Sequence, residues 1–149
     1  MFVCNPITQK FNILPPSTYD VGHSVGEARL GFDPTASSHF LVIEYVDADA
    51  VCVDVEIYSS ETAAWIYKES KWGKHTNVTF YRSPSVFLNG CLHIMGHSRV
   101  YSMILAMDME GNTWRKIDRP SGLQHSIHQA QGHLCVCIVA GPNYSELSI

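Results

Sequence analysis

The feature that most constrains this chain is a short pattern that occurs three times. In each copy a mostly apolar run leads into a polar four-residue turn and then reaches one large aromatic residue. The turns span residues 6–9, 59–62 and 109–112, and the aromatic residues are Phe11, Trp65 and Trp114, separated by 54 and 49 positions. Hairpins that recur at a spacing near fifty residues indicate repeated units that bury their faces by stacking on one another.

This spacing, with one hairpin and one aromatic residue per repeat, is typical of kelch-like β-propeller blades. We therefore predict an all-β fold: one domain over residues 1–149, forming a partial, about three-blade kelch-like β-propeller of antiparallel sheets. Propellers typically close with about four to eight blades. Because the pattern begins with half a repeat at Phe2 and stops at Tyr144, we expect an incomplete ring. Each repeat aromatic should pack against the neighbouring blade.

Alternating and continuous apolar runs predict the individual strands. The run Phe40–Val46 should be an inner strand buried on both faces, whereas 51–58 alternates and should have one wetter face. Asn89-Gly90 between two apolar runs predicts a tight hairpin joining 86–88 to 91–95. The remaining expected strands are 101–107, 134–140 and, within the helix-tolerant tract 61–72, an outer strand.

Composition excludes several classes of partner. The chain is 46% hydrophobic and 16% charged with a net charge of −4, which describes a globular protein without a nucleic-acid-binding signature. No apolar run approaches 18 residues and no signal peptide is evident, so we expect no membrane partner and a cytoplasmic and/or nuclear location. The five cysteines form no CxxC motif and should be buried thiols in a reducing compartment.

One motif suggests catalysis. Gly22-His23-Ser24-Val25-Gly26 matches the G-x-S-x-G nucleophile elbow, in which a strand turns sharply into a helix. The prolines before it and Gly31 and Pro34 after it leave little room for that strand and helix. A small serine esterase that uses Ser24 with His125 or His128 is therefore an alternative function, ranked below a non-catalytic one.

Metal and cofactor sites are not predicted. His93 and His97 lack the glutamate of an H-E-x-x-H motif, and on a strand they would lie too far apart to chelate one ion. Asp47-Ala48-Asp49 begins like a calcium loop but lacks the later ligand and the glycine, so a hairpin turn is the better interpretation. We predict no catalytic, cofactor-binding or metal-binding residues.

Several segments together resemble the F-box-associated propeller region of plant F-box proteins. They are Leu30–Pro34, Ser38–Ile43 and Val55–Thr62 with Trp65, followed by Val86–His93 and the Trp114 hairpin, together with the opening Val3–Thr8 and Leu14–Pro16. The resemblance covers essentially the whole chain.

The resemblance implies a non-catalytic protein-binding module, namely the substrate-recognition part of an SCF-type E3 ubiquitin ligase. In that family an N-terminal F-box docks on a Skp-type adaptor, and loops of the propeller hold a target protein for ubiquitination. No helical F-box sequence precedes Phe2, so adaptor binding is expected only if an F-box exists upstream. The loops expected to contact a target are Asp47–Ala50, Lys71–Asn77 and His97–Arg99. A nonfunctional truncated remnant is the remaining alternative.

Overall fold

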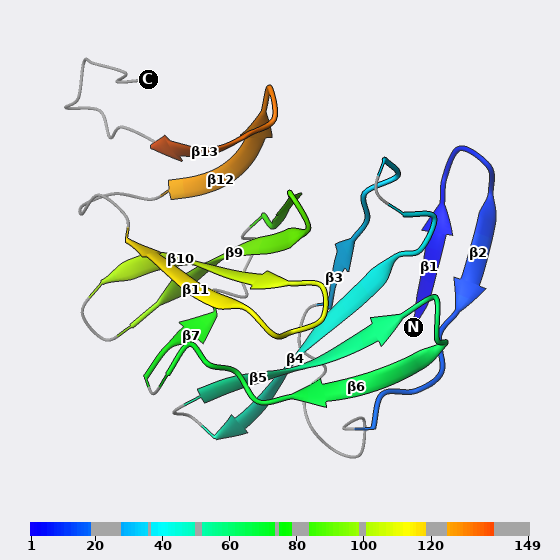
Figure 1. The fold of residues 1–149 in the computed structure, drawn as a ribbon, viewed down its shortest axis with the longest axis horizontal. Coiled ribbons are helices and arrows are strands. Elements are labelled where there is room, and N and C mark those ends of the chain that lie inside the picture. Colours follow the sequence, from blue (N-terminus) through cyan, green and yellow to red (C-terminus); the bar gives the residue numbers. More distant parts are fainter. Residues whose placement is uncertain are drawn as a thin grey trace.

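The computed structural model describes residues 1–18, 28–35, 37–49, 52–73, 75–78, 84–98, 101–118 and 125–138. These residues form four sheets in which every strand pair is antiparallel (Figure 1). The prediction of an all-β fold built from antiparallel sheets is confirmed. A closed ring is not present among the described strands.

Two small sheets flank two larger ones. The first hairpin consists of β1 (Phe2–Asn5) and β2 (Lys10–Ile13). The β3–β6 sheet contains β3 (Ala28–Gly31), β4 (Leu41–Asp49), β5 (Cys52–Ser59) and β6 (Ala64–Lys68) in that order. The β7–β11 sheet contains β7 (Asn77–Val78), β8 (Val86–Leu88), β9 (Cys91–His97), β10 (Ser102–Asp108) and β11 (Trp114–Asp118). The last hairpin consists of β12 (His125–Ala130) and β13 (His133–Ile138).

Each copy of the repeated pattern forms a hairpin, as predicted. The hairpins are β1–β2, β5–β6 and β10–β11, and their equivalent cross-strand pairs are Cys4–Phe11, Tyr58–Trp65 and Met107–Trp114. The second turn lies one residue later than predicted, because β5 continues through Ser59 and the turn occupies 60–63. The tract with helix-tolerant composition forms the edge strand β6, as expected.

The three turns share a hydrogen-bonding device that explains their polar sequences. The last residue of the incoming strand is Asn5, Ser59 or Asp108, and its side-chain oxygen accepts backbone N–H groups of the turn. Asn5 accepts from Ile7 at 3.0 Å, Ser59 accepts from Glu61 at 3.2 Å, and Asp108 accepts from Asn112 and Thr113 at 2.8 Å each. Short polar side chains that bind the backbone a few residues onward favour turns in this way.

A second kind of hairpin has a two-residue turn. Asn89 and Gly90 have φ of 52° and 72°, and Gln131 and Gly132 have φ of 49° and 76°. Two successive positive φ angles characterise the type I′ turn that joins antiparallel strands. The Asn89-Gly90 hairpin was predicted; the β12–β13 hairpin was not, because glutamine is uncommon at the first position of this turn. The predicted strand 134–140 is observed as β13 through Ile138, and residues 139–140 lie outside the described residues.

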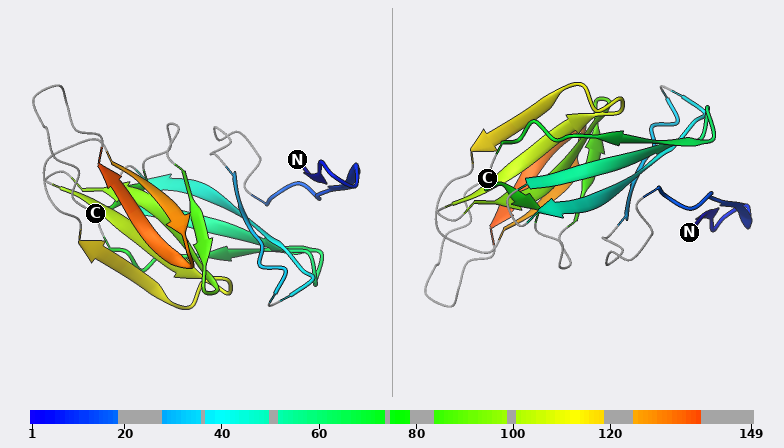
Figure 2. Two further views of the ribbon diagram at one scale, coloured as in Figure 1. Left: turned by 90° about the horizontal axis from the view of Figure 1, so that it is seen from above. Right: turned by 90° about the horizontal axis from the view of Figure 1, so that it is seen from below.

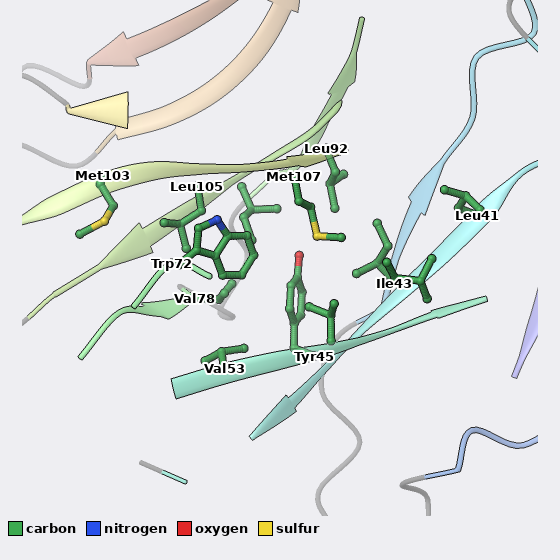
Figure 3. Close-up of a cluster of buried hydrophobic side chains, with 13 residues drawn as sticks. Leu41, Ile43, Tyr45, Val53, Trp72, Val78, Leu92, Met103, Leu105 and Met107 are labelled. Atoms are coloured by element: carbon green, nitrogen blue, oxygen red, sulfur yellow. The ribbon is translucent and has the colours of Figure 1, made fainter. Parts of the chain in front are cut away.

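The main hydrophobic core lies between the two large sheets (Figure 2). Tyr45 points from β4 toward the opposite sheet, and Trp72, from the segment between β6 and β7, lies between the two (Figure 3). The Trp72 side chain is 2% exposed, and its indole N–H donates to the carbonyl of Ala106 at 3.3 Å. Leu41–Val46 is buried at every position, so the prediction of a strand buried on both faces is confirmed.

The repeat aromatics are less buried than expected. Trp65 and Trp114 are half-buried; each lies on the face of its sheet that looks toward the preceding hairpin or sheet. The Trp65 indole N–H donates to the Pro15 carbonyl at 2.9 Å. Phe11 is 64% exposed, so the expectation that every repeat aromatic packs on a neighbouring blade is wrong for the first copy.

The second face of β5 is also buried, which corrects the expectation of a wetter face. Asp54 is 8% exposed and Glu56 is 1% exposed. Asp54 accepts hydrogen bonds from the Tyr67 hydroxyl and, at 2.9 Å, from the Ser70 N–H, while Glu56 accepts from the Thr18 hydroxyl. Buried carboxylates require such partners because desolvation without hydrogen bonds is costly.

Candidate binding surfaces

The two large sheets present their connecting segments at two distinct ends. The turns β5–β6 and β10–β11 both point to the right in Figure 1, and we call this side of the sheets the turn end. The end of β4 and start of β5, the end of β9 and start of β10, and the described residues between β6 and β7 lie on the other side, which we call the loop end. These three connections contain the three loops that the sequence analysis selected. The structure therefore brings the predicted loops to one end of the two sheets.

Strand pairing joins two of the predicted loops directly. Asn77, at the end of the Lys71–Asn77 loop, lies opposite His97 in the β7–β9 pair. Trp72 and Thr76 anchor the same loop, since both are 2% exposed and the Thr76 hydroxyl donates to the Trp72 carbonyl at 3.2 Å. The Lys116 ammonium of β11 donates to the Thr76 hydroxyl at 2.8 Å. This loop is consequently held by the core rather than extended into solvent.

Beside and between these anchors the loop has exposed residues. Lys71, Gly73 and His75 are exposed, and Gly73 and His75 have positive φ of 80° and 62°. Left-handed backbone at two positions indicates a tight path of the chain. The arrangement is a loop anchored in the core that exposes the polar residues Lys71 and His75, which suits the presentation of side chains to another protein.

The other predicted loops differ in detail from the expectation. Asp47 and Asp49 belong to β4 and pair with Val53 and Cys52 across a register irregularity, so this segment is strand rather than the predicted hairpin turn. Ala50 lies outside the described residues. In the third loop the Ser98 N–H donates to the Tyr101 carbonyl at 2.8 Å, which holds the two ends of the loop close together. Arg99 lies outside the described residues.

A groove that the sequence analysis did not anticipate lies between the β1–β2 hairpin and the segment around β3. Its volume is about 610 Å³, and its lining combines Phe11, Phe32 and Phe40 with the polar Lys10 and Asn12. In the sequence, Leu30–Pro34, which contains Phe32, indicated a family resemblance and not a groove. A groove of this size, lined by the exposed Phe11 and Phe32 and the half-buried Phe40, can accommodate side chains of a peptide.

The predicted catalytic alternative receives no support from the described residues. The Gly22–Gly26 motif, with Ser24, lies outside them. His128 on β12 is exposed, and its Nε2 lies 2.7 Å from the Ser126 hydroxyl, a neighbour on the same strand. His125 begins the same strand.

The histidine pair on β9 is divided between two environments. His93 lies opposite Ala106 and is half-buried, whereas His97 lies opposite Ser102 and is exposed. Burial lowers the pKa of His93, against smaller opposing effects of hydrogen bonds with the backbone of Val86 and Cys91. In the described part of the chain no group of three or more His, Cys, Asp or Glu side chains is arranged to hold a metal ion.

The cysteines are less buried than predicted. Cys4 and Cys137 are exposed, Cys91 and Cys135 are half-buried, and all four carry free thiols. Cys135 and Cys137 share one face of β13, as their spacing indicated, and face Ser126 and His128 of β12. Among the described residues no helix has the length and apolar character needed to cross a membrane.

Comparison with known proteins agrees with the repeated hairpins and the resemblance. Residues 1–137 match the family model described as the F-box associated beta propeller domain. A curated F-box protein of Arabidopsis thaliana is 27% identical over 137 aligned residues, which cover 83% of this chain and 37% of that protein. The chain thus spans little more than a third of the length of this relative. No solved structure matches. The chain belongs to the F-box associated beta-propeller domain family.

Proposed function

We propose that this chain is the non-catalytic, target-binding region of an F-box protein, and that the loop end of its two large sheets contacts the target. The observation that carries this proposal is the convergence of the three predicted loops at one end of a rigid framework. Binding residues are often found on loops that a rigid scaffold positions. Family membership and the F-box relative supply the functional class.

In this proposal, residues 1–149 are a propeller domain with no F-box of their own. The Skp-type adaptor would be bound by an F-box upstream of the propeller, and the target protein by the loop end. Ubiquitination of the target would follow because the ligase holds the target and the adaptor in one complex. Ubiquitin transfer by the other ligase subunits needs no catalytic residue in this chain.

The test compares variants with altered charge at the two ends. Lys71→Glu combined with His75→Glu alters exposed side chains of the loop end, and Glu61→Lys combined with Glu110→Lys alters exposed side chains of the turn end. Each protein is fused to an F-box and used for quantitative affinity capture from plant extract in the presence of a proteasome inhibitor.

We expect the loop-end variant to lose at least one captured protein by about tenfold or more, because charge reversal within a contact costs over 1 kcal/mol. The turn-end variant should retain that protein, and both variants should retain the adaptor. Loss caused only by the turn-end variant would contradict the assignment of the loop end.

A further inference from the structure

An exposed cation faces an open position on the loop that joins β6 to β7. The Lys116 ammonium of β11 donates to the Thr76 hydroxyl at 2.8 Å. A Cβ atom built on Gly73 would lie 3.9 Å from this ammonium and, among the described residues, within 4 Å of no other atom beyond its chain neighbours. Gly73 and Lys116 are both exposed. The loop therefore offers an accessible position beside a positive charge.

Two further cationic positions lie in the same loop. Lys71 and His75 are exposed, one before and one after Gly73 along the chain. Within the described part of the chain, neither Lys71 nor Lys116 forms an ion pair with a carboxylate, and the one hydrogen-bond partner of Lys116 is a neutral hydroxyl. Their positive charges therefore remain available to an anionic group of another molecule.

The sequence of this loop is positive within a negative chain. Residues 68–76 contain three lysines and one glutamate, a net charge of +2, whereas the whole chain has a net charge of −4. All other residues together therefore carry −6. Charged surfaces attract partners of the opposite sign and repel those of the same sign. An anionic partner is consequently favoured at this loop over the rest of the chain.

Nearby carboxylates keep the positive region small. Asp118 follows Lys116 by two positions in β11, so the two side chains leave the strand on the same face, and Asp118 is exposed. Asp47 and Asp49, near the end of β4, also belong to the loop end. The positive region is therefore local, around Gly73 and Lys116. It suits a short acidic segment better than an extended polyanion.

We propose that the loop end recognises a short acidic segment of the target protein, with one carboxylate beside Gly73 and Lys116; this inference rests on the proposed function. The carboxylate would accept a charge-assisted hydrogen bond from the ammonium. Lys71 and His75 would lie beside neighbouring residues of the segment. A phosphorylated segment matches less well, because arginine is the preferred partner of phosphate, and the described cations here are lysine and histidine.

The first experiment measures the binding of fluorescein-labelled peptides to the full chain by fluorescence anisotropy at low salt. One peptide contains four glutamates, a second has glutamines in their place, and a third has two phosphoserines, which give a similar total charge. We expect the glutamate peptide to bind at least about tenfold more tightly than the glutamine peptide. This difference should shrink at high salt, because salt screens exposed charges. Equal binding of these two peptides, or tighter binding of the phosphoserine peptide, would overturn the proposal.

A second experiment locates the binding at Lys116. Lys116→Gln should weaken binding of the glutamate peptide by about threefold or more, and Lys116→Arg, which keeps the charge, should retain it. Arg115→Gln is the matched control, because Arg115 is exposed on the same strand and its side chain leaves on the opposite face. It should leave binding unchanged, whereas Asp118→Asn should strengthen binding by removing a competing carboxylate.

Equal losses for Lys116→Gln and Arg115→Gln would overturn the assignment of the site. Thermal unfolding followed by circular dichroism establishes that each variant is folded. If Lys116→Gln is not folded, Lys71→Gln takes its place with the same expected loss, since Lys71 is exposed and its side chain forms no contact that holds the loop to the core.

Failure of this inference can be told apart from failure of the proposed function. If Lys71→Glu with His75→Glu removes a captured target but the chain shows no preference for the glutamate peptide, the loop end contacts a target and the acidic-segment proposal is wrong. If the chain prefers the glutamate peptide but that double variant loses no captured protein, recognition of acidic peptides stands and the assignment of target binding to the loop end is wrong.

Discussion

Trp72 and Trp114 meet edge to face between the two large sheets, with their ring centroids 4.6 Å apart and their planes at 84°. Trp114 is the repeat aromatic of β11, whereas Trp72 belongs to the loop that connects the sheets and is 2% exposed. The contact fastens a candidate target-binding loop to the core. An edge-to-face aromatic pair stabilises the folded state by about 0.5–1.5 kcal/mol more than the burial of its surface alone.

Trp72→Ala should therefore be the most destabilising of the tryptophan substitutions. Deletion of a buried indole costs roughly 3–5 kcal/mol, and the half-buried Trp65 and Trp114 should cost less. Urea titration at one protein concentration measures these losses. Tyr101→Ala serves as the control, because Tyr101 is 53% exposed and its removal should change stability by about 0.5 kcal/mol or less. Equal losses for Trp72 and Tyr101 would contradict the packing described.

Gly96→Ala should destabilise the β7–β11 sheet. A Cβ atom at this position would lie 2.5 Å from Leu105 Cδ1 and 3.1 Å from the Asn77 carbonyl oxygen. Overpacking of this kind costs about 1–3 kcal/mol. If the clash with Leu105 is the cause, Gly96→Ala combined with Leu105→Val should lose less than the sum of the single losses. A double-mutant cycle by urea unfolding checks this, and strict additivity would argue against the contact.

Asp108 should make the chain less stable in acid. Burial alone would raise its pKa, but hydrogen bonds from the Thr113 side chain and from turn N–H groups, including those of Asn112 and Thr113, hold the pKa below its usual value. The stabilisation is therefore present above the unfolded pKa of about 3.9 and is lost as pH falls through the lower folded value. Asp108→Asn should reduce the difference in Tm between pH 7 and pH 3. An unchanged pH dependence would contradict this role.

His93 should contribute a separate pH dependence nearer neutrality. Because burial lowers its pKa in the folded state, the unfolded chain binds the proton more readily. The stability it contributes is complete above the unfolded pKa of about 6.5 and declines as pH falls. His93→Gln should flatten the stability profile between about pH 5 and 7, whereas His128→Gln, at an exposed position, should not. Similar profiles for the two variants would refute the assignment.

The sequence was sufficient to predict the repeated hairpins and most of the longer strands, though not β3, β7 or β12, because these features depend on local alternation and turn chemistry. Asn89-Gly90 is one such local signal, and Asn5 and Asp108 at the ends of strands are others. Burial was predicted less well, because it depends on what lies against each face. Phe11 and Trp65 occupy equivalent positions, yet Phe11 is exposed and Trp65 packs beside Leu14.

The candidate binding surface was predicted only in part, again because local sequence patterns do not show which segments pack against one another. The three loops were chosen by position and polarity, and strand direction alone brings them to one end of the sheets. The sequence does not reveal that Trp72 anchors one of these loops in the core. A single tryptophan between Lys71 and Gly73 gives no pattern by which a buried side chain in a loop can be told from an exposed one. The groove beside Phe32 and Phe40 depends on how the first hairpin packs, which local patterns do not specify.

Site-specific photocrosslinking is the most direct test of target binding at the loop end. A benzophenone amino acid at position 71 lies in that end, and one at position 62 lies in the β5–β6 turn at the opposite end; both positions are exposed. After irradiation in plant cells that express the F-box fusion, we predict a covalent adduct with a target protein from position 71 and none from position 62. An adduct formed from position 62 and not from position 71 would contradict the account.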